Sequence, residues 1–406
     1  MTLIERQQAG CSSSNGRSPP RTGIWLLITT LLFSIADWTL LWALPRLRLS
    51  FATGTEIVPP LVASLLVRML LIWGLAAARL FAQVRWIARD VARDTARKSR
   101  SVQQQKSSSI PHNATLPLVL AFLALNLAFS LVQIDAYVLE PQWVQTTELT
   151  LSFDRLQLDA PPVRVVHLTD LHVERNSYRE AKIIHKVNAL QPDLILFTGD
   201  YLNLSRLHDP VSAAHWRQFV SQLEAPYGIY AVRGTLEPSL ESMAWLVEET
   251  GVTWLEQETK SLDIRGQKVT LVGIACSHDL ELDAARLDQA LNSAPGAARD
   301  TFTLLLYHSP DLIREAAEHE IDLYLSGHTH GGQLRLPLLG PIVTGSVYGR
   351  QYVAGLFEMP PNAGGRGTQH STWMYNSRGL GLEGSSMPRA RFLCPPEIVS
   401  IDIQGR

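Results

Sequence analysis

Six aspartate and histidine side chains occur in four short stretches where their types and spacing could hold metal ions. The stretches read Asp170-Leu171-His172, Gly199-Asp200, His308 and Gly327-His328-Thr329-His330. Each directly follows a short apolar run that is typical of a buried strand. Ligands collect at the carboxyl ends of strands in open α/β sheets, so we expect these side chains to meet at one edge of a sheet.

The types of these side chains indicate a binuclear metal site that acts on phosphate. Carboxylate and imidazole ligands suit Mn, Fe and Zn ions and require no thiolate. A carboxylate can bridge two cations about 3.5–4 Å apart, and such a pair neutralises phosphoryl oxygens and makes hydroxide available near neutral pH. The three cysteines, Cys11, Cys276 and Cys394, lack the paired spacing of a metal site. Aspartate and histidine are therefore the expected ligands.

The elements that position these residues begin at about residue 149. From there, short β-branched runs alternate with amphipathic stretches, which is typical of an α/β fold. The predicted strands are Val163–Leu168, Leu194–Thr198, Ile229–Arg233, Val269–Gly273, Phe302–Tyr307, Leu323–Leu325 and Glu397–Ile403. The predicted helices are Tyr178–Leu190, His215–Leu223, Leu240–Glu249, Asp283–Leu291 and Pro310–Glu318. About 255 residues suffice for one core with a layered sheet.

The motif series resembles the calcineurin-like metallophosphoesterase superfamily over about Val163 to Ile403. Details of the tail resemble its membrane-anchored branch, namely Gly331-Gly332-Gln333, Tyr348-Gly349-Arg350 and Ser377-Arg378-Gly379-Leu380-Gly381. That branch includes hydrolases of UDP-2,3-diacylglucosamine, a lipid A precursor. The resemblance implies a sandwich of two mixed sheets flanked by helices, and two divalent metal ions as cofactors.

The resemblance also implies which residues hold each ion. The first ion is assigned to Asp170, His172, Asp200 and His330. The second ion shares Asp200 and takes His308 and His328. The family completes the second site with the Asn of a Gly-Asn-His-Asp/Glu motif, whose His contacts the phosphate and protonates the leaving group.

The chain departs from the family at this last motif. The matching stretch reads Gly234-Thr235-Leu236-Glu237. Thr235 offers only a neutral hydroxyl and is a doubtful metal ligand, and Leu236 can neither donate a proton nor bind an anion. His278 and Glu237 are candidate substitutes for the catalytic acid, and the alternative is that both are ordinary loop residues.

The first third of the chain predicts a membrane anchor. Apolar segments at Ile24–Leu44, Ile57–Ala78 and Thr115–Ile134 are each about 20 residues long, enough to cross a bilayer. The loop between the second and third segments is rich in Arg and Lys, which by the positive-inside rule places it in the cytoplasm and the domain that follows outside. The sequence therefore predicts a multi-pass protein of the cell membrane with an extracytoplasmic globular domain.

The expected organisation has four parts. These are a polar N-terminal segment (1–23), three transmembrane helices with a basic loop at 82–114 (24–134), a linker (135–148) and the phosphoesterase domain (149–406). A formal net charge of −2 gives no basic field, so we expect no nucleic-acid partner. The sequence does not indicate an oligomeric state.

Two functions are compatible with these features. The first is a membrane-anchored, metal-dependent phosphohydrolase that cleaves a phosphoester or pyrophosphate bond of a lipid-linked substrate such as UDP-2,3-diacylglucosamine. An extracytoplasmic domain would instead favour other phosphoesters, such as phospholipid headgroups. The second is a metal-binding regulatory or scaffold protein with little turnover, which the altered motif Gly234-Thr235-Leu236-Glu237 supports.

Overall fold

The computed structural model describes residues 115–406, apart from 176–177, 238, 294–300, 362–369 and 383–387, together with isolated positions between 28 and 92. The expected spans Ile24–Leu44 and Ile57–Ala78 and the basic loop 82–114 lie, but for those positions, outside the described residues. The third expected span is a helix, α3 (Thr115–Ile134). Among the described residues, no helix is both long and apolar enough to cross a membrane. Residues Leu131–Arg406 belong to one compact unit.

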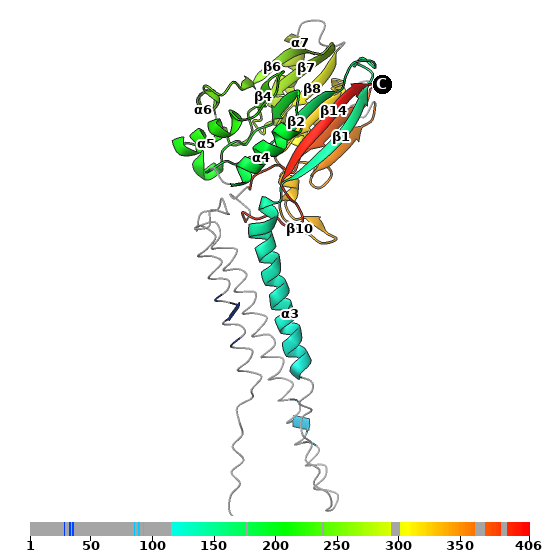
Figure 1. Cartoon of the computed structure of the whole chain (residues 1–406). Helices are drawn as coiled ribbons and strands as arrows, with labels where there is room; N and C mark the ends of the chain where they lie inside the picture. Colours follow the sequence, from blue (N-terminus) through cyan, green and yellow to red (C-terminus); the bar gives the residue numbers. More distant parts are fainter. Residues whose placement is uncertain are drawn as a thin grey trace, which may run out of the picture. The chain divides into compact units, whose positions relative to one another are not determined.

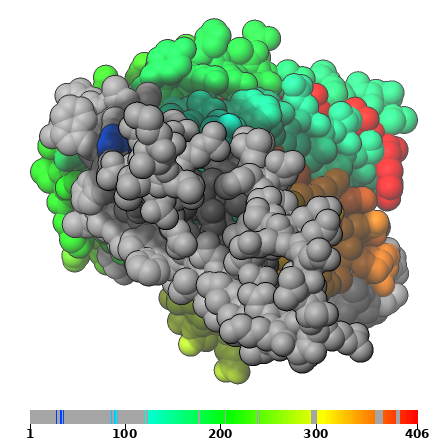
Figure 2. Space-filling view, turned by 90° about the horizontal axis from the view of Figure 1, so that it is seen from below, coloured from blue at the N-terminus to red at the C-terminus, as the bar shows by residue number. Residues whose placement is uncertain are grey.

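Two mixed six-stranded sheets form the body of this unit (Figure 1). The first has the strand order β1 (Gln145–Phe153), β14 (Glu397–Gly405), β2 (Val163–Leu168), β3 (Leu194–Phe197), β4 (Ile229–Val232) and β5 (Thr253–Leu255). The second has the order β12 (Gly355–Met359), β13 (Thr372–Asn376), β9 (Leu323–Ser326), β8 (Phe302–Leu306), β7 (Gln267–Ile274) and β6 (Gln257–Ile264). Strands β2 to β5 are parallel, as are β7, β8, β9 and β13. Seen from below, the blue-green β1 and the red β14 lie at one edge (Figure 2).

The two sheets pack face to face, and helices cover their outer faces. Along β3, Leu194 and Leu196 point into the core between the sheets, whereas Ile195 and Phe197 pack under the helices, as the two-residue period of a strand requires. The first sheet is covered by α4 (Tyr178–Ala189), α5 (Pro210–Val220) and α6 (Leu240–Val247). The second is covered by α7 (Leu280–Ser293) and α8 (Ile313–Glu318). The predicted sandwich of two mixed sheets is confirmed.

The predicted strands and most predicted helices agree closely with the structure, whereas β5, β6, β12 and the largely buried β13 were not predicted. Strand β2 has the predicted bounds, and β3, β4 and β8 each end one residue earlier than predicted. The largest difference among the helices is α5, which begins at Pro210 rather than His215. Asp209 caps this helix because its carboxylate accepts a hydrogen bond from the Val211 N–H, and Pro210 suits the first helical position.

The segment 135–148, expected to be a linker, is ordered and packed onto the domain. It forms a π-helical turn, η2 (Asp135–Leu139), a 3₁₀ turn, η3 (Glu140–Gln142), and the start of β1. Tyr137 is buried, and the buried Glu140 carboxylate accepts hydrogen bonds from the backbone N–H groups of Leu393 and Cys394. The first four residues of β1, Gln145-Thr146-Thr147-Glu148, are polar, so the sequence did not predict a strand here. Pairing with β14 stabilises this edge strand instead.

The core between the sheets should dominate the stability of the domain. Leu304 is fully buried there on β8. Leu304→Ala should lower the free energy of unfolding by about 2–5 kcal/mol, because the substitution leaves a cavity that neither sheet can close. Leu158, which is 70% exposed, provides the control. Leu158→Ala should leave the midpoint of denaturant unfolding, followed by circular dichroism, almost unchanged, and equal losses in the two variants would contradict this account of the core.

Candidate metal centre

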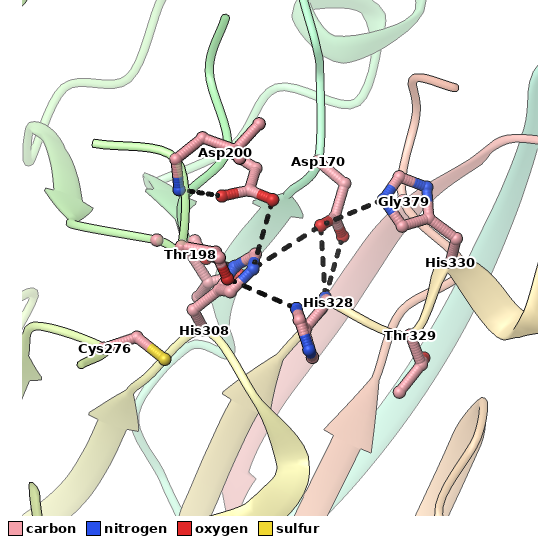
Figure 3. A network of polar contacts seen from close by, with 12 residues as sticks. Asp170, Thr198, Asp200, Cys276, His308, His328, Thr329, His330 and Gly379 are labelled. Carbon is pink, nitrogen blue, oxygen red and sulfur yellow. Dashed lines mark hydrogen bonds and ion pairs between the residues drawn. The ribbon is translucent and has the colours of Figure 1, made fainter. Parts of the chain in front are cut away.

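The six predicted ligands follow four strands that are paired within their sheets. Asp170 follows β2 and Asp200 follows β3, and these neighbours in the first sheet place Leu168 opposite Phe197. His308 follows β8, whereas His328 and His330 follow β9, and these neighbours in the second sheet place Leu306 opposite Leu325. The carboxyl ends of all four strands meet, so both carboxylates face the imidazoles (Figure 3). The predicted cluster at the strand ends is therefore present.

The backbone at these residues is strained. A left-handed conformation is uncommon outside glycine and costs on the order of 1–3 kcal/mol for each residue. Five of the six predicted ligands adopt it, with φ of 50° at Asp170, 48° at His172, 55° at Asp200, 69° at His328 and 49° at His330. Such strain persists only where surrounding contacts enforce it, and clustering of this kind is typical of functional sites.

Backbone hydrogen bonds and close glycine contacts hold the strained turns. The Asp170 N–H donates to the Gly199 carbonyl at 3.1 Å, and the His172 N–H donates to the Asp200 carbonyl at 3.1 Å. Gly327 lies directly against the Asp170 carboxylate, where any side chain would collide with it. The two turns that carry the aspartates are therefore locked to each other.

The first possible metal site consists of Asp170, His172 and His330, all of them buried. The Nε2 atoms of His172 and His330 lie 3.0 Å apart, and the His330 Nε2 lies 3.5 Å from Asp170 Oδ1. Burial, helped by the nearby His172, lowers the pKa of His330 well below its usual value. The neutral imidazole is the form that binds a metal ion.

The second possible site consists of Asp170, Asp200 and His308. The His308 Nε2 lies 3.4 Å from Asp200 Oδ2 and 3.9 Å from Asp170 Oδ1. The His308 Nδ1 donates to the Thr198 carbonyl at 2.6 Å, which orients the ring and directs Nε2 at the two carboxylates. This buried Nε2 has no hydrogen-bond partner among the described residues. A cation between these groups would satisfy it, so the residues fit a metal ion.

The two carboxylates have opposite pKa shifts. Burial raises the pKa of Asp170 to about 7, with His308 opposing the shift and Asp200 adding to it. Burial also acts to raise the pKa of Asp200, but His308 and the other imidazoles outweigh it and leave that pKa below its usual value. Two buried carboxylates that share imidazole neighbours cannot both be ionised without positive charge between them.

His328 lies beside the second site and does not belong to either compact group. Its backbone N–H donates to both carboxylate oxygens of Asp170 at 3.1 Å, and its ring lies 5.0 Å from the His308 ring. Asp170 is common to both groups, although the sequence assigned the shared position to Asp200. Asp200 Oδ2 also lies 3.9 Å from the His172 Nε2, so its carboxylate faces imidazoles of both groups.

The altered motif occupies the place beside the metal centre that the resemblance gave it. The Leu236 N–H donates to Asp200 Oδ1 at 3.0 Å, and Gly234 packs directly against Gly199. Glu237 is buried, and its carboxylate accepts hydrogen bonds from the N–H groups of Gly234, Asp200 and Tyr201 at 2.8, 3.2 and 2.9 Å. Burial, and then the charge of Asp200, raise the pKa of Glu237 to about 7. Its two carboxylate oxygens are nevertheless taken up by backbone N–H groups of the loop, which disfavours it as the substitute acid.

His278, the other candidate acid, reaches the site from the loop between β7 and α7. The Thr235 Oγ1 lies 2.7 Å from the His278 Nε2 and 3.4 Å from the His328 Nδ1. The His278 ring is 4.8 Å from the His328 ring and remains exposed to solvent. Partial burial, and then the charge of His308, lower the pKa of His278, so the imidazolium form is disfavoured at neutral pH.

One residue that supports the site was not identified from the sequence. Arg391 is fully buried, and its guanidinium donates to the carbonyls of Arg378, Gly379, Gly381 and Cys394. The Gly381 N–H donates in turn to the Asp170 carbonyl. Arg391 therefore positions the loop that supports Asp170, and an arginine in a Gly- and Pro-rich tail carries no periodic signal that could have revealed this.

Comparison with known proteins gives the family. Residues 163–332 match the family described as calcineurin-like phosphoesterase. The chain is 30% identical over 279 residues to the metallophosphoesterase YkuE of Bacillus subtilis, covering 66% of this chain and 89% of that protein. It is 30% identical over 279 residues to the phosphodiesterase YaeI of Escherichia coli, covering 65% and 90%. It is 23% identical over 318 residues to the UDP-2,3-diacylglucosamine pyrophosphatase LpxG of Chlamydia trachomatis, covering 64% and 89%.

The chain therefore belongs to the calcineurin-like metallophosphoesterase family. It is a metallophosphoesterase, a hydrolase that acts on phosphoester bonds. The family binds two divalent metal ions, and this chain brings together two groups of side chains that can hold them.

Asp200 offers the sharpest test of the centre. Asp200→Asn keeps an oxygen for the Leu236 N–H and removes one negative charge, so metal content should fall from two ions per chain and metal-dependent hydrolysis should be lost. Elemental analysis and a phosphatase assay would measure both. The control Asp263→Asn alters an exposed aspartate near the end of β6 and should change neither. Unchanged metal content in Asp200→Asn would exclude Asp200 as a ligand.

Proposed function

We propose that this chain is a membrane-anchored, metal-dependent phosphohydrolase that cleaves a phosphoester or pyrophosphate bond of a lipid-linked substrate. The observation that carries the proposal is the convergence of the Asp170 and Asp200 carboxylates with imidazoles from β8 and β9 at one point. Imidazole and carboxylate favour Mn, Fe or Zn as the two ions. When bound, such ions neutralise phosphoryl oxygens and make hydroxide available near neutral pH.

The residues of the chain would bind the two ions and orient their ligands. Asp170, His172 and His330 would hold one ion, and Asp200, His308 and His328 would complete the second site, with Thr235 as a weak further ligand. The Thr198 carbonyl fixes the orientation of His308, and the Glu237 carboxylate braces the turn that carries Asp200. His308 and Asp200 are thus each held by a second contact, which orients a metal ligand.

Protonation of the leaving group falls to His278 in this proposal. Leu236 carries no proton, Glu237 is engaged with backbone N–H groups, and His278 is the imidazole nearest to Thr235. Because its pKa is lowered, only a small fraction of His278 would carry the proton at neutral pH, which limits its use as an acid. A phosphate leaving group, as in a pyrophosphate bond, hardly needs protonation, so this class of substrate suits the site best.

Two observations support the proposal that the substrate is lipid-linked: the name of one relative and the apolar segments of the expected membrane anchor. LpxG of Chlamydia trachomatis is named for a lipid-linked pyrophosphate, UDP-2,3-diacylglucosamine. The apolar segments Ile24–Leu44, Ile57–Ala78 and Thr115–Ile134 would hold the domain at the bilayer. A reporter fused to the C-terminus would determine the side: an extracytoplasmic domain, as the basic loop favours, would direct the search to phospholipid headgroups instead of the lipid A precursor.

The alternative is a metal-binding regulatory or scaffold protein. The observation that favours it is the replacement of the family's amide and imidazole by Thr235 and Leu236 beside the second site. Its distinguishing result would be tight metal binding together with no hydrolysis of any activated phosphoester. The retention of six ligands, five of them in strained backbone conformations, favours the enzyme, since binding one ion needs fewer.

Leaving-group dependence tests the role of the altered motif. Aryl phosphates and pyrophosphates should turn over and alkyl phosphates should not, because general acid catalysis contributes roughly 10²–10⁴-fold to the hydrolysis of poor leaving groups. Rates over a series of leaving-group pKa values would measure this. His278→Asn should steepen the dependence further, whereas His185→Asn, a change in an exposed histidine on α4, should not. Equal rates on aryl and alkyl substrates in the unaltered protein would show that an effective acid is present.

Restoring the family residues should reverse the effect. Thr235→Asn combined with Leu236→His should raise alkyl phosphate turnover most and flatten the dependence on leaving-group pKa, because an imidazole and an amide return beside the second site. The same change should tighten binding of the weaker ion, measured by competition with a chelator. A double variant with an unchanged leaving-group dependence would mean that other side chains already perform both tasks.

A further inference from the structure

A cluster of exposed apolar side chains follows directly after the metal-binding turn of β9. It lies on the small hairpin of β10 (Arg335–Leu336) and β11 (Gly340–Pro341) and on the residues after it. We call residues 336–347 the apolar hairpin. Its exposed side chains are Leu336, Leu338, Leu339, Ile342, Val343 and Val347, with Leu338 fully exposed at the tip. Single exposed leucines are ordinary, but six large apolar side chains within twelve residues mark an interaction surface.

The root of the apolar hairpin is firmly fixed. The Arg335 N–H donates to the Phe392 carbonyl at 2.9 Å, and Arg350 donates to the Leu339 carbonyl at 2.9 Å. On the return side, the Ser346 hydroxyl and the Val347 N–H donate to the buried Asp311 carboxylate at 2.5 and 3.2 Å. The exposed side chains therefore project from a hairpin whose base is held to the domain by hydrogen bonds.

The apolar hairpin is also close to the metal centre. A side chain at Gly345 would begin 3.4 Å from the His328 Nε2, and Gly332 packs directly on Pro341. A molecule that covers the apolar hairpin would therefore come within reach of His328.

The same end of the domain receives the chain from α3. The segment that pairs with Arg335 continues into Leu393, whose N–H donates to the Glu140 carboxylate of η3 at 2.8 Å. Leu139 and Trp143, on either side of η3, are 57% and 61% exposed, and Leu393 is half exposed. Figure 1 shows the β10 hairpin at this end. Exposed leucine and tryptophan side chains that share one end of a domain are typical of a contact with the membrane interface.

The charge around the hairpin complements anionic lipid. No Asp or Glu occurs from Leu323 to Phe357, whereas Arg335 and Arg350 flank the apolar residues. Arginine stems can lie along apolar surface while the guanidinium groups reach phosphate headgroups. Together, an apolar tip and a basic root match the boundary between acyl chains and headgroups.

We propose that the apolar hairpin inserts into the interface of a lipid bilayer and there presents lipid-linked phosphoesters to the His328 side of the metal centre. The occupant of this surface is thus the bilayer itself. The presentation of substrate rests on the proposed function, whereas the insertion does not.

Depth-dependent quenching tests the insertion. The full-length protein carrying Cys11→Ser and Leu338→Cys, labelled with an environment-sensitive fluorophore, would be placed in vesicles of phosphatidylethanolamine and phosphatidylglycerol that contain acyl-chain nitroxide lipids. The remaining cysteines, Cys276 and Cys394, are buried. Leu158→Cys, at an exposed site between β1 and β2, provides the matched control for a domain that is merely held near the membrane.

The label at 338 should shift to shorter wavelength and be quenched by the acyl-chain nitroxide, and the label at 158 should show neither change. Equal, weak quenching at both sites would overturn the insertion. Loss of solvent exposure at 338 without vesicles, together with a doubled mass in solution, would also overturn it, because the surface would then be covered by a second copy of the chain.

A kinetic experiment tests the presentation of substrate. Leu338→Asp with Leu339→Asp should lower the ratio of the rate on a vesicle-borne phospholipid phosphoester to the rate on a soluble aryl phosphate by at least about tenfold, since two large apolar side chains no longer insert. Leu158→Asp should leave this ratio unchanged, and an unchanged ratio in the hairpin variant would overturn the presentation. Failure of the unaltered protein to hydrolyse even the aryl phosphate would contradict the proposed function, while the quenching result would still decide the insertion.

Discussion

The arrangement of this domain depends on two buried carboxylates that share the same imidazole neighbours. Asp170 and Asp200 are almost completely buried and both approach the His308 Nε2. Burying one unpaired carboxylate is costly, and burying two side by side is more so. The opposite pKa shifts of the two groups reflect this conflict. Two divalent cations held by these groups would offset this cost.

The sandwich supplies what the two carboxylates require. The two aspartates and His172 follow largely buried strands of the first sheet, and the other three imidazoles follow two paired strands of the second. The core between the sheets therefore fixes the distance between the two sets of ligands. The strained turns add a cost on the order of 1–3 kcal/mol per residue, which the core and the cross-turn hydrogen bonds must offset. A rigid scaffold with strained, braced ligands favours one geometry for two ions over an adaptable site for one.

The sequence was sufficient for most of the buried strands, although not for β13, and for the cluster of ligands, because these have strong local signals. Strand β2 and its neighbours are apolar runs in the sequence. The polar motif that directly follows each run must therefore lie at the end of the strand. Strand β1 was missed because it begins with polar residues and gains its stability from pairing with β14, some 250 residues later in the chain. No local pattern records such a pairing.

Contacts between side chains that are far apart in the sequence could not be predicted from local sequence patterns either. Glu237 was a candidate acid by type, and only its three backbone partners show that it braces the loop. His278 could be proposed by type as well, and the fold places it against Thr235 from a different loop. Arg391 and its carbonyl partners carried no signal at all, because the role of a buried arginine depends on carbonyl groups from several turns that converge only in the folded chain.

The central claim is that the chain holds two ions between its paired strand ends. Anomalous diffraction from crystals of the full-length protein soaked with Mn²⁺ would test it most directly, because each ion gives its own peak. The account predicts two peaks about 3.5–4 Å apart, one beside His172 and His330 and the other beside His308, with an aspartate between them. A single peak at full occupancy, or two peaks too far apart for one carboxylate to bridge, would contradict it.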